Sequence, residues 1–221
     1  MLLLALDTAT PAMTVALHDG LVALAGQTTV SSRRHGELLA AMIEQVLAAG
    51  GAARTDLDVI AVGTGPGPYT GLRAGVVTAR VLASALGVPA VGVCTLDVMA
   101  CAAAPAAAGR AFVVAADARR KEVYWARYAP SAERVGDPAV SRPAALAAQI
   151  TASCPVAGEG PALYPELGGC PIPPRYPDAA QLAQIAAERL ARGDPPGPAE
   201  PLYLRRPDAR VPGKTKRVTP V

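Results

Sequence analysis

The sequence of 221 residues predicts an α/β protein in which one lobe is built twice, the second time in reduced form. Three observations support this prediction. Apolar strands at the N-terminus form a meander, helices and strands then alternate through a glycine-rich turn, and the strand pattern begins again at residue 111. Because 51% of the residues are hydrophobic but only 4% are aromatic, the core must consist largely of Ala, Val and Leu.

The first lobe is predicted to occupy residues 1–104. Asp19-Gly20 is a strong signal for a hairpin turn, and Gly50-Gly51 and Gly87 are typical stops for two helices. The expected elements are, in order, strands over 2–7, 13–18 and 21–30, a helix over 38–47, a strand over 59–62, a helix over 70–86 and a strand over 90–93.

The second lobe is predicted to occupy residues 105–200, after an Ala/Pro/Gly-rich boundary over 102–109. The expected elements are strands over 111–116 and 123–128, a helix over 141–150, a strand over 155–157 and a helix over 178–193. Little room remains after residue 123 for a third hairpin strand and a full crossover, so this copy is expected to be reduced. A meander followed by α/β crossovers, occurring twice along the chain, is the layout of the duplicated RNase H-like lobe of actin-like and sugar-kinase folds.

The net charge of +3 is not spread evenly over the chain. Residues 205–221 carry +5, while the rest of the chain carries −2. The last segment of the chain, residues 201–221, is therefore expected to end in a basic tail. That tail is either disordered and solvated or in contact with the phosphates of an RNA.

The four cysteines and the N-terminus both indicate a cytoplasmic protein. Cys94, Cys101, Cys154 and Cys170 form no C-x-x-C pair, so buried, reduced thiols are expected. The apolar run at the N-terminus is too short for a signal peptide and lacks its basic start. No stretch reaches the length of a membrane span without a proline or a charge, so no membrane contact is predicted.

A glycine-rich loop follows the strand over 59–62. Its residues are Gly65, Pro66, Gly67, Pro68, Tyr69, Thr70 and Gly71. Such a loop can cradle a phosphate at the start of a helix, but this one contains no lysine, and its two prolines lack backbone N–H donors. A rigid turn that aims the following helix is therefore the preferred interpretation.

The helix after this loop carries small residues one turn apart, at Gly75, Ala79 and Ala83. Because small and apolar residues fall on more than one of its faces, it is expected to be covered on two sides. One side is the sheet, and the other is either the helix over 38–47 or another chain. The residues predicted to form an interface with a partner chain are His35, Leu38, Leu39, Met42, Ile43, Val46, Leu72, Val76, Ala79, Arg80 and Ala83.

Asp7, Thr8 and Thr10 lie at the first hairpin. These residues and the following Pro11 favour a tight turn, which is the simpler interpretation. The alternative is a residual site for an anion or a nucleotide. In actin-like kinases and ATPases an Asp at this place approaches Mg²⁺, and neighbouring hydroxyls approach phosphates.

No arrangement of residues in the sequence points to a catalytic centre, a metal site or a cofactor. His18 and His35 do not have the spacing of a metal-binding pair; His18 is expected at the surface of a hairpin and His35 at the start of a helix. The sequence contains no G-x-S-x-G motif, and no two acids are marked as an acid–base pair.

Three segments make the sequence similar to the TsaB family of bacterial tRNA threonylcarbamoyladenosine biosynthesis proteins. They are Leu4-Ala5-Leu6-Asp7-Thr8-Ala9-Thr10, the glycine-rich loop with its continuation Leu72-Arg73-Ala74-Gly75, and Asp117-Ala118-Arg119-Arg120-Lys121-Glu122-Val123-Tyr124. His35-Gly36-Glu37-Leu38-Leu39 and Tyr203-Leu204-Arg205 add to the resemblance. Pro68-Tyr69 and Gly36 depart from the usual Ser-Phe and Ser of the family.

The resemblance implies an actin-like (ASKHA) fold and a partner role. TsaB-like proteins are non-catalytic partners of TsaD, which transfers threonylcarbamoyl to N6 of adenosine 37 in tRNAs that read ANN codons, and TsaE, an ATPase, joins them. In the family, the helices that match 36–49 and 71–86 form a bundle with TsaD. Thr95 and Met99 stand where TsaD has the two histidines of its metal site, and neither is a suitable replacement.

The leading hypothesis is therefore a non-catalytic subunit that pairs with a TsaD-like catalytic subunit. A TsaE-like ATPase is a further expected partner, and tRNA is expected to be contacted indirectly or through the basic tail. The isolated chain is expected to form a homodimer, because large apolar helix faces are rarely left exposed. The alternatives are a stand-alone ASKHA-fold ATPase or phosphotransferase, which needs a complete nucleotide site, and a peptidase, for which no nucleophile–base pair is found.

Overall fold

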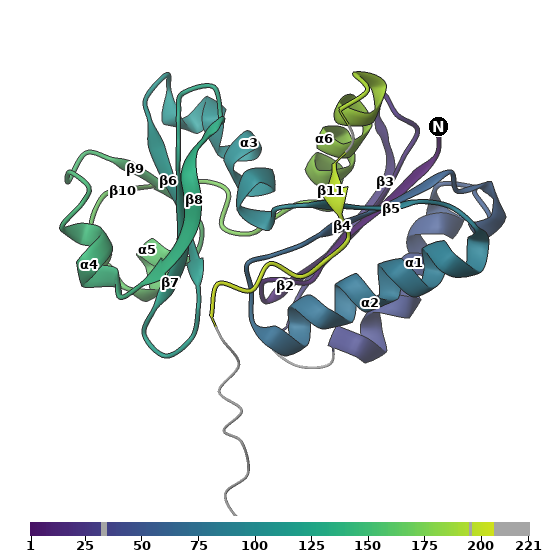
Figure 1. The fold of residues 1–221 in the computed structure, drawn as a ribbon, viewed down its shortest axis with the longest axis horizontal. Coiled ribbons are helices and arrows are strands. Elements are labelled where there is room, and N and C mark those ends of the chain that lie inside the picture. Colours follow the sequence, from purple (N-terminus) through teal and green to yellow (C-terminus); the bar gives the residue numbers. More distant parts are fainter. Residues whose placement is uncertain (32–34, 195, 206–221) are drawn as a thin grey trace, which may run out of the picture.

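Two β-sheets lie side by side, and helices cover both of them (Figure 1). The computed structural model describes residues 1–31, 35–194 and 196–205, without the side chains of residues 35–37. Among the helices so described, none is long and apolar enough to cross a membrane.

The first sheet combines an antiparallel meander with two parallel strands. Its strands are β1 (Leu3–Asp7), β2 (Ala12–His18), β3 (Ala23–Val30), β4 (Val59–Gly63), β5 (Ala90–Val93) and β11 (Gly197–Pro198), in the order β11-β5-β4-β1-β2-β3. β1 pairs antiparallel with β2 and parallel with β4. β1 and β4 are buried along their whole length, as expected for strands with helices on both faces.

The second sheet repeats this topology strand for strand. Its strands are β6 (Phe112–Asp117), β7 (Val123–Tyr128), β8 (Arg134–Ser141), β9 (Pro155–Ala157) and β10 (Cys170–Ile172), and their order β10-β9-β6-β7-β8 matches β5-β4-β1-β2-β3. The prediction that no third hairpin strand follows residue 123 is therefore wrong. β8 lies at the sheet edge, contains Gly136, Asp137 and Pro138, and is nowhere fully buried, so it carries no apolar pattern.

The reduction of the second lobe lies in its helices. In the first lobe, α1 (His35–Ala49) and α2 (Tyr69–Leu86) have 15 and 18 residues. Their counterparts, α4 (Pro143–Ala147) and α5 (Gly160–Leu163), have 5 and 4 residues. Short 3-10 turns, η1 (Arg54–Asp56) and η2 (Pro165–Leu167), follow α1 and α5. The predicted duplicated α/β layout with a reduced second lobe is thus confirmed.

Two further helices, α3 (Thr95–Ala107) and α6 (Ala179–Ala191), each cover the sheet of the other lobe (Figure 1). α3 follows the first sheet in the chain, but its Leu96 belongs to one apolar cluster with Phe112 of the second sheet. α6 follows the second sheet, but its Leu182 belongs to one cluster with Leu3 of the first sheet. Residues 179–198 thus return to the first sheet, although the sequence division placed them in the second lobe.

The positions of these two helices explain two wrong expectations. The segment 102–109 is not a boundary but the second half of α3 and its end, with Pro105 inside the helix. His18 is 2% exposed rather than at the surface. Its Nε2 lies 3.0 Å from Oε1 of Gln184, so α6 covers the end of β2.

The cysteines were expected to be buried. Cys170 is instead exposed, and the other three cysteines are half-buried.

β1 divides the first lobe into two apolar layers. Leu4 and Leu6 face the layer that contains α1 and α2, whereas Leu3 and Ala5 face the layer that contains α6. This alternation follows from the two-residue period of a strand. α2 therefore packs against one face of β1 only.

Leu182 tests the packing of α6 on the first sheet. It is fully buried, so Leu182→Ala should lower the free energy of unfolding by about 2–4 kcal/mol, through lost burial and the cavity left behind. Leu21→Ala is the matched control: Leu21 is 82% exposed, and its loss should change stability by less than about 0.5 kcal/mol. Urea unfolding measures both values, and equal effects would contradict the position of α6.

Candidate functional site

The glycine-rich loop before α2 is fastened to a buried carboxylate at the end of β1. Oδ1 of Asp7 accepts a hydrogen bond from the N–H of Ala9 (2.7 Å), and Oδ2 accepts one from the hydroxyl of Thr95 (2.7 Å). The Thr95 hydroxyl oxygen accepts from the N–H of Gly65 (3.0 Å), and the Thr95 N–H donates to the carbonyl of Gly65 (2.8 Å). One network thereby joins β1, the loop and the start of α3.

The loop and the first hairpin approach so closely that only glycine fits between them. A Cβ on Gly63 would overlap the Asp7 carboxylate, and a Cβ on Gly67 would overlap the carbonyl of Ala9. Burial raises the pKa of Asp7 to about 6, although the hydrogen bonds from Ala9 and Thr95 oppose this shift. The loop therefore acts as a rigid turn packed on the hairpin, and its glycines are required by this contact.

Thr8 holds the first turns of α2. Its hydroxyl donates to the carbonyl of Gly71 (2.7 Å) and accepts from the N–H of Gly75 (3.0 Å). These two backbone groups are an i, i+4 pair, so the hydroxyl bridges one rung of the helical ladder. A Cβ on Gly75 would overlap this hydroxyl oxygen, which explains the smallest residue at this position.

Thr10 completes the hairpin turn. Its hydroxyl exchanges hydrogen bonds with the carbonyl and N–H of Ala12, at 3.3 and 3.2 Å. The structure thus brings Asp7, Thr8 and Thr10 together, and their hydrogen bonds described above all go to groups of the protein itself. This matches the turn-building interpretation, while a residual anion or nucleotide site at these three residues stays a prediction.

Gly75→Ala tests the contact between Thr8 and α2. Alanine in place of glycine inside a helix ordinarily stabilises a protein by about 1 kcal/mol. Here the added methyl group must displace the Thr8 hydroxyl from two hydrogen bonds, so we expect the opposite sign, a loss of about 1–3 kcal/mol. Gly26→Ala is the control, because its Cβ would meet atoms at 3.7 and 3.8 Å. Stabilisation by Gly75→Ala in urea unfolding would disprove the contact.

The Asp7 carboxyl should make stability depend on pH. Its pKa of about 6 in the folded state lies above the ordinary value of 3.8, so the folded state binds the proton more tightly. Stability from this group therefore increases as the pH falls from about 6 to about 4 and is constant below that range. Asp7→Asn cannot titrate, so the difference in unfolding free energy between wild type and variant should change by about 2–3 kcal/mol over the window. A difference that is constant from pH 4 to 7 would count against a buried, titrating Asp7.

Most of the residues predicted to face a partner chain instead face the core of the first lobe, which corrects that prediction. The buried ones are Leu39, Met42, Ile43, Val46, Leu72, Val76, Ala79 and Ala83. They form the stripe with which α1 and α2 pack on the sheet, because the sheet covers the most continuous apolar stripe of each helix. Of the other three, Arg80 is exposed and Leu38 is half-buried, whereas the side chain of His35 lies outside the described part of the structure.

A second set of apolar residues forms the outer surface of the same two helices. Val77 and Val81, one turn apart on α2, are 57% and 63% exposed. They border a groove of about 510 Å³ between α1 and α2, whose other lining residues are Ala40, Ile43, Glu44, Arg54, Thr78, Leu82 and Ala85. An ion pair between Arg54 and Glu44 (3.0 Å) gives the groove a polar edge. The sequence predicted a second covered face of α2 but assigned the wrong residues to it.

The C-terminal segment contacts the start of α2. The sequence analysis did not predict this contact, because the two segments are far apart in the chain. The rings of Tyr69 and Tyr203 stack with centroids 5.3 Å apart, and the guanidinium of Arg73 lies 3.7 Å from the Tyr69 centroid. Nε of Arg73 also donates to the hydroxyl of Tyr203 (2.7 Å). Further along, Arg205 forms an ion pair with Glu122 in the turn between β6 and β7. The segment therefore connects the two lobes.

No group of three or more His, Cys, Asp or Glu residues that could hold a metal ion occurs within residues 1–31, 35–194 and 196–205. The Thr95 hydroxyl donates a hydrogen bond to Asp7, and Met99 is fully buried in the cluster that joins α3 to the second sheet. Both residues, which the sequence resemblance aligned with the metal-binding histidines of TsaD, therefore have structural contacts in this chain.

Comparison with known proteins gives consistent results over the whole chain. A family model described as TsaD, tRNA N6-adenosine threonylcarbamoyltransferase, matches residues 27–162. The tRNA threonylcarbamoyladenosine biosynthesis protein TsaB of Escherichia coli is 34% identical over 232 residues, covering 97% of this chain and 100% of that protein. An uncharacterized protein of Mycobacterium tuberculosis is 44% identical over 211 residues, covering 94% and 93%.

The same likeness extends to three dimensions. The solved structure of YeaZ from Pseudomonas aeruginosa matches with a TM-score of 0.77 and 33% identity, covering 92% of this chain and 99% of that one. The match includes both lobes, so the predicted actin-like, two-lobed fold is confirmed.

Proposed function

Because this chain belongs to the TsaB family of tRNA threonylcarbamoyladenosine biosynthesis proteins, we propose that it serves in forming this modified nucleoside as a non-catalytic partner subunit. Its proposed partner is a TsaD-like subunit, which transfers threonylcarbamoyl to N6 of adenosine 37 in tRNAs that read ANN codons. The observation that carries the proposal is the exposed apolar groove between α1 and α2.

The groove has the properties of a surface that receives a helix. Val77 and Val81 form an apolar ridge at a spacing of one turn, and both are more than half exposed. An apolar groove beside a helix suits the apolar face of an incoming helix. Charged residues lie at the edge, at Glu44 and Arg54, as in a typical interface with an apolar centre and a polar rim.

A TsaD-like chain is a suitable occupant because it is built from a related lobe. The transferase family model matches residues 27–162, which contain α1 and α2. A related chain would bring the same two helices, and two such pairs can pack about a pseudo-twofold axis as a four-helix bundle. The same surface can pair with a second copy of itself, so the proposal includes a homodimer for the isolated chain.

The hydrogen bonds made by the first hairpin support the proposal that the chain is non-catalytic. Asp7 and Thr8 hold the loop and the helix that lead to the groove, and Thr95 donates to Asp7. Side chains that would otherwise approach a metal or a phosphate thus position the partner surface. A TsaE-like ATPase and tRNA complete the proposed assembly, by resemblance to the family.

Two charges on the groove should separate the subunits. Val77→Glu with Val81→Glu would place two carboxylates in an apolar contact, so we expect at least tenfold less co-purification with the tagged TsaD-like subunit of the same organism. Threonylcarbamoyladenosine should then stay low in the tRNA of a strain that carries only this variant. The isolated double variant should also sediment as a monomer under conditions in which the wild type is a dimer.

The matched control is Leu21→Glu with Val22→Glu, because these residues are 82% and 58% exposed in the turn between β2 and β3. Both double variants should keep the melting temperature of the wild type, because all four positions are exposed. Full co-purification of the Val77/Val81 variant would refute the groove as the interface. Normal nucleoside levels in a strain that lacks this chain would refute the function itself.

A further inference from the structure

The turn between β6 and β7 carries three consecutive cations in an unusual backbone conformation. Arg119, Arg120 and Lys121 are all exposed, and their φ angles are +61°, +55° and +59°. Residues with a Cβ are disfavoured in this left-handed region, and rarely occupy it in succession. Such strain persists where the surrounding structure imposes it, and it gathers at functional sites. The segment is also one of the motifs shared with the family that the groove does not explain.

Hydrogen bonds within the turn fix this conformation. The N–H of Ala118 donates to the carbonyl of Glu122 (2.9 Å), and the N–H of Glu122 donates to the carbonyl of Arg119 (3.0 Å). Oδ1 of Asp117 accepts from the N–H of Arg119 (2.9 Å). The carboxylate of Asp117 is only 8% exposed, so the acid lies inward while the cations lie at the surface.

Exposed aromatic rings from the start of α2 and from the C-terminal segment adjoin this turn. Tyr69 and Tyr203 stack on each other beside Arg73, yet they remain 44% and 40% exposed. Arg205, two residues after Tyr203, donates from Nη1 to the carbonyl of Ala118 (3.3 Å). Two residues span at most about 7.2 Å of chain, and the side chain of Arg205 extends from there to the basic turn, so the rings lie near this turn.

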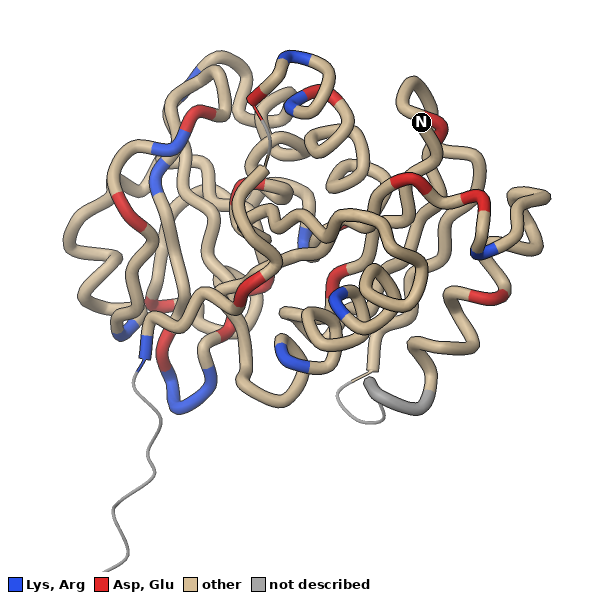
Figure 2. Tube along the Cα trace, turned by 45° about the vertical axis from the view of Figure 1, so that its right-hand side comes forward, with Lys and Arg blue, Asp and Glu red and all other residues tan. Residues whose placement is uncertain are grey.

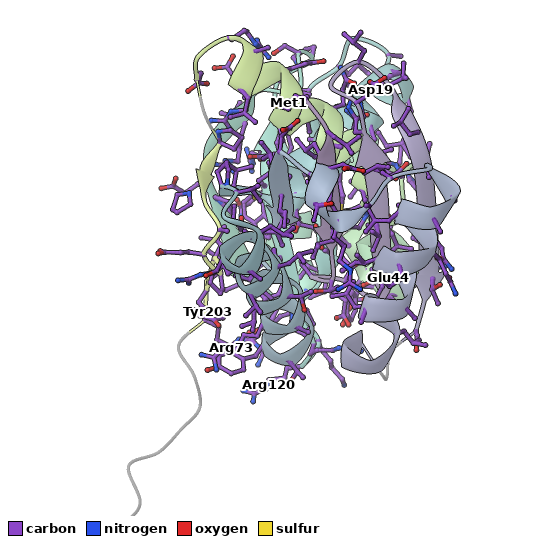
Figure 3. All side chains as sticks on the ribbon, turned by 90° about the vertical axis from the view of Figure 1, so that its right-hand side faces the viewer. Met1, Asp19, Glu44, Arg73, Arg120 and Tyr203 are labelled. Atoms are coloured by element: carbon purple, nitrogen blue, oxygen red, sulfur yellow. The ribbon has the colours of Figure 1, made fainter. Side chains whose placement is uncertain are left out.

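We call the combined surface the basic–aromatic rim; its residues are Tyr69, Arg73, Arg119, Arg120, Lys121, Tyr203 and Arg205. Figure 3 shows Arg73, Tyr203 and Arg120 together at one end of the molecule, and Figure 2 shows the basic turn as one blue segment. The rim contains five cations, of which Arg119 pairs with the carboxylate of Asp117 and Arg205 with that of Glu122. Residues 1–204 as a whole carry −2, so the positive charge of the rim is local.

We propose that the basic–aromatic rim is an RNA-binding surface, on which the cations contact phosphates and Tyr203 stacks on an unpaired base. The inference rests on the proposed function in taking tRNA as the RNA. Cations alone would suit any polyanion, including an acidic protein. Exposed rings beside guanidinium groups favour nucleic acid, because every base has a face that stacks on an aromatic ring.

The test measures binding of an unmodified transcript of a tRNA that reads an ANN codon to the purified complex with the TsaD-like subunit. The triple variant Arg119→Asn, Arg120→Asn, Lys121→Asn removes three charges, and asparagine tolerates the left-handed region, so the turn is kept. We expect at least tenfold weaker binding at moderate salt, and a slope of log affinity against log salt that is reduced by about 2. Tyr203→Ala should weaken binding about tenfold, whereas Tyr203→Phe, which keeps the ring, should stay within about twofold.

The control triple variant is Arg110→Gln, Arg127→Gln, Arg192→Gln, which removes the same charge from exposed arginines. Arg110 and Arg127 lie at the end of the β6–β7 pair that is opposite to the basic turn. It should bind with nearly the affinity and salt slope of the wild type. Equal effects of the two triple variants, or no effect of either, would overturn the inference and leave the proposed function standing, provided that the complex forms. The turn variant could instead fail to form the complex, while the fraction that does assemble binds tRNA with unchanged affinity. That result would make the rim a contact with the partner protein and would also overturn the inference.

Discussion

The hydrogen bond from the Thr95 hydroxyl to the buried Asp7 carboxylate joins segments that are far apart in the chain. A carboxylate without water is unfavourable, and this one is retained because both of its oxygens accept hydrogen bonds within the first lobe. The same hydroxyl binds the loop at Gly65, so the end of β1, the loop and α3 hold one another in place. The position of α2, and with it the shape of the outer groove, depends on this small network together with Thr8.

The two lobes are also bound to each other by the exchange of α3 and α6. Each of these helices contributes largely alanine to the sheet that it covers, with Ala100 and Ala103 on one and Ala183 and Ala186 on the other, all fully buried. Alanine lets a helix backbone approach a sheet closely, which suits a core with few aromatic residues. A helix that crosses to the other lobe couples the two sheets, and the contact of Arg205 with Glu122 couples them again on the side of the basic–aromatic rim.

The candidate site shows where sequence reasoning succeeds and where it fails. Periodicity identified α2 as a helix with two apolar sides, but it could not tell which side faces the sheet, because Val76 and Val77 are equally apolar. Packing in the folded protein decides this: Val76 packs in the core of the first lobe, and Val77 is exposed. The stacking of Tyr69 on Tyr203 joins residues 134 positions apart in the chain, and neither local propensity nor spacing predicts such a contact.

The sequence by itself determined those features whose causes are local. Strands β1, β4 and β6 follow from short apolar runs, α1 and α2 from helical periodicity, α6 from its start and stop signals, and the rigid loop from its prolines and glycines. The tertiary structure alone decided that residues 134–141 form an edge strand, that His18 is buried, that α3 and α6 change lobes, and which stripe of α2 remains exposed. The reason is the same in each case. These outcomes are set by which apolar surfaces meet across the sheet, and that free energy belongs to pairs of segments distant in the chain rather than to any one of them.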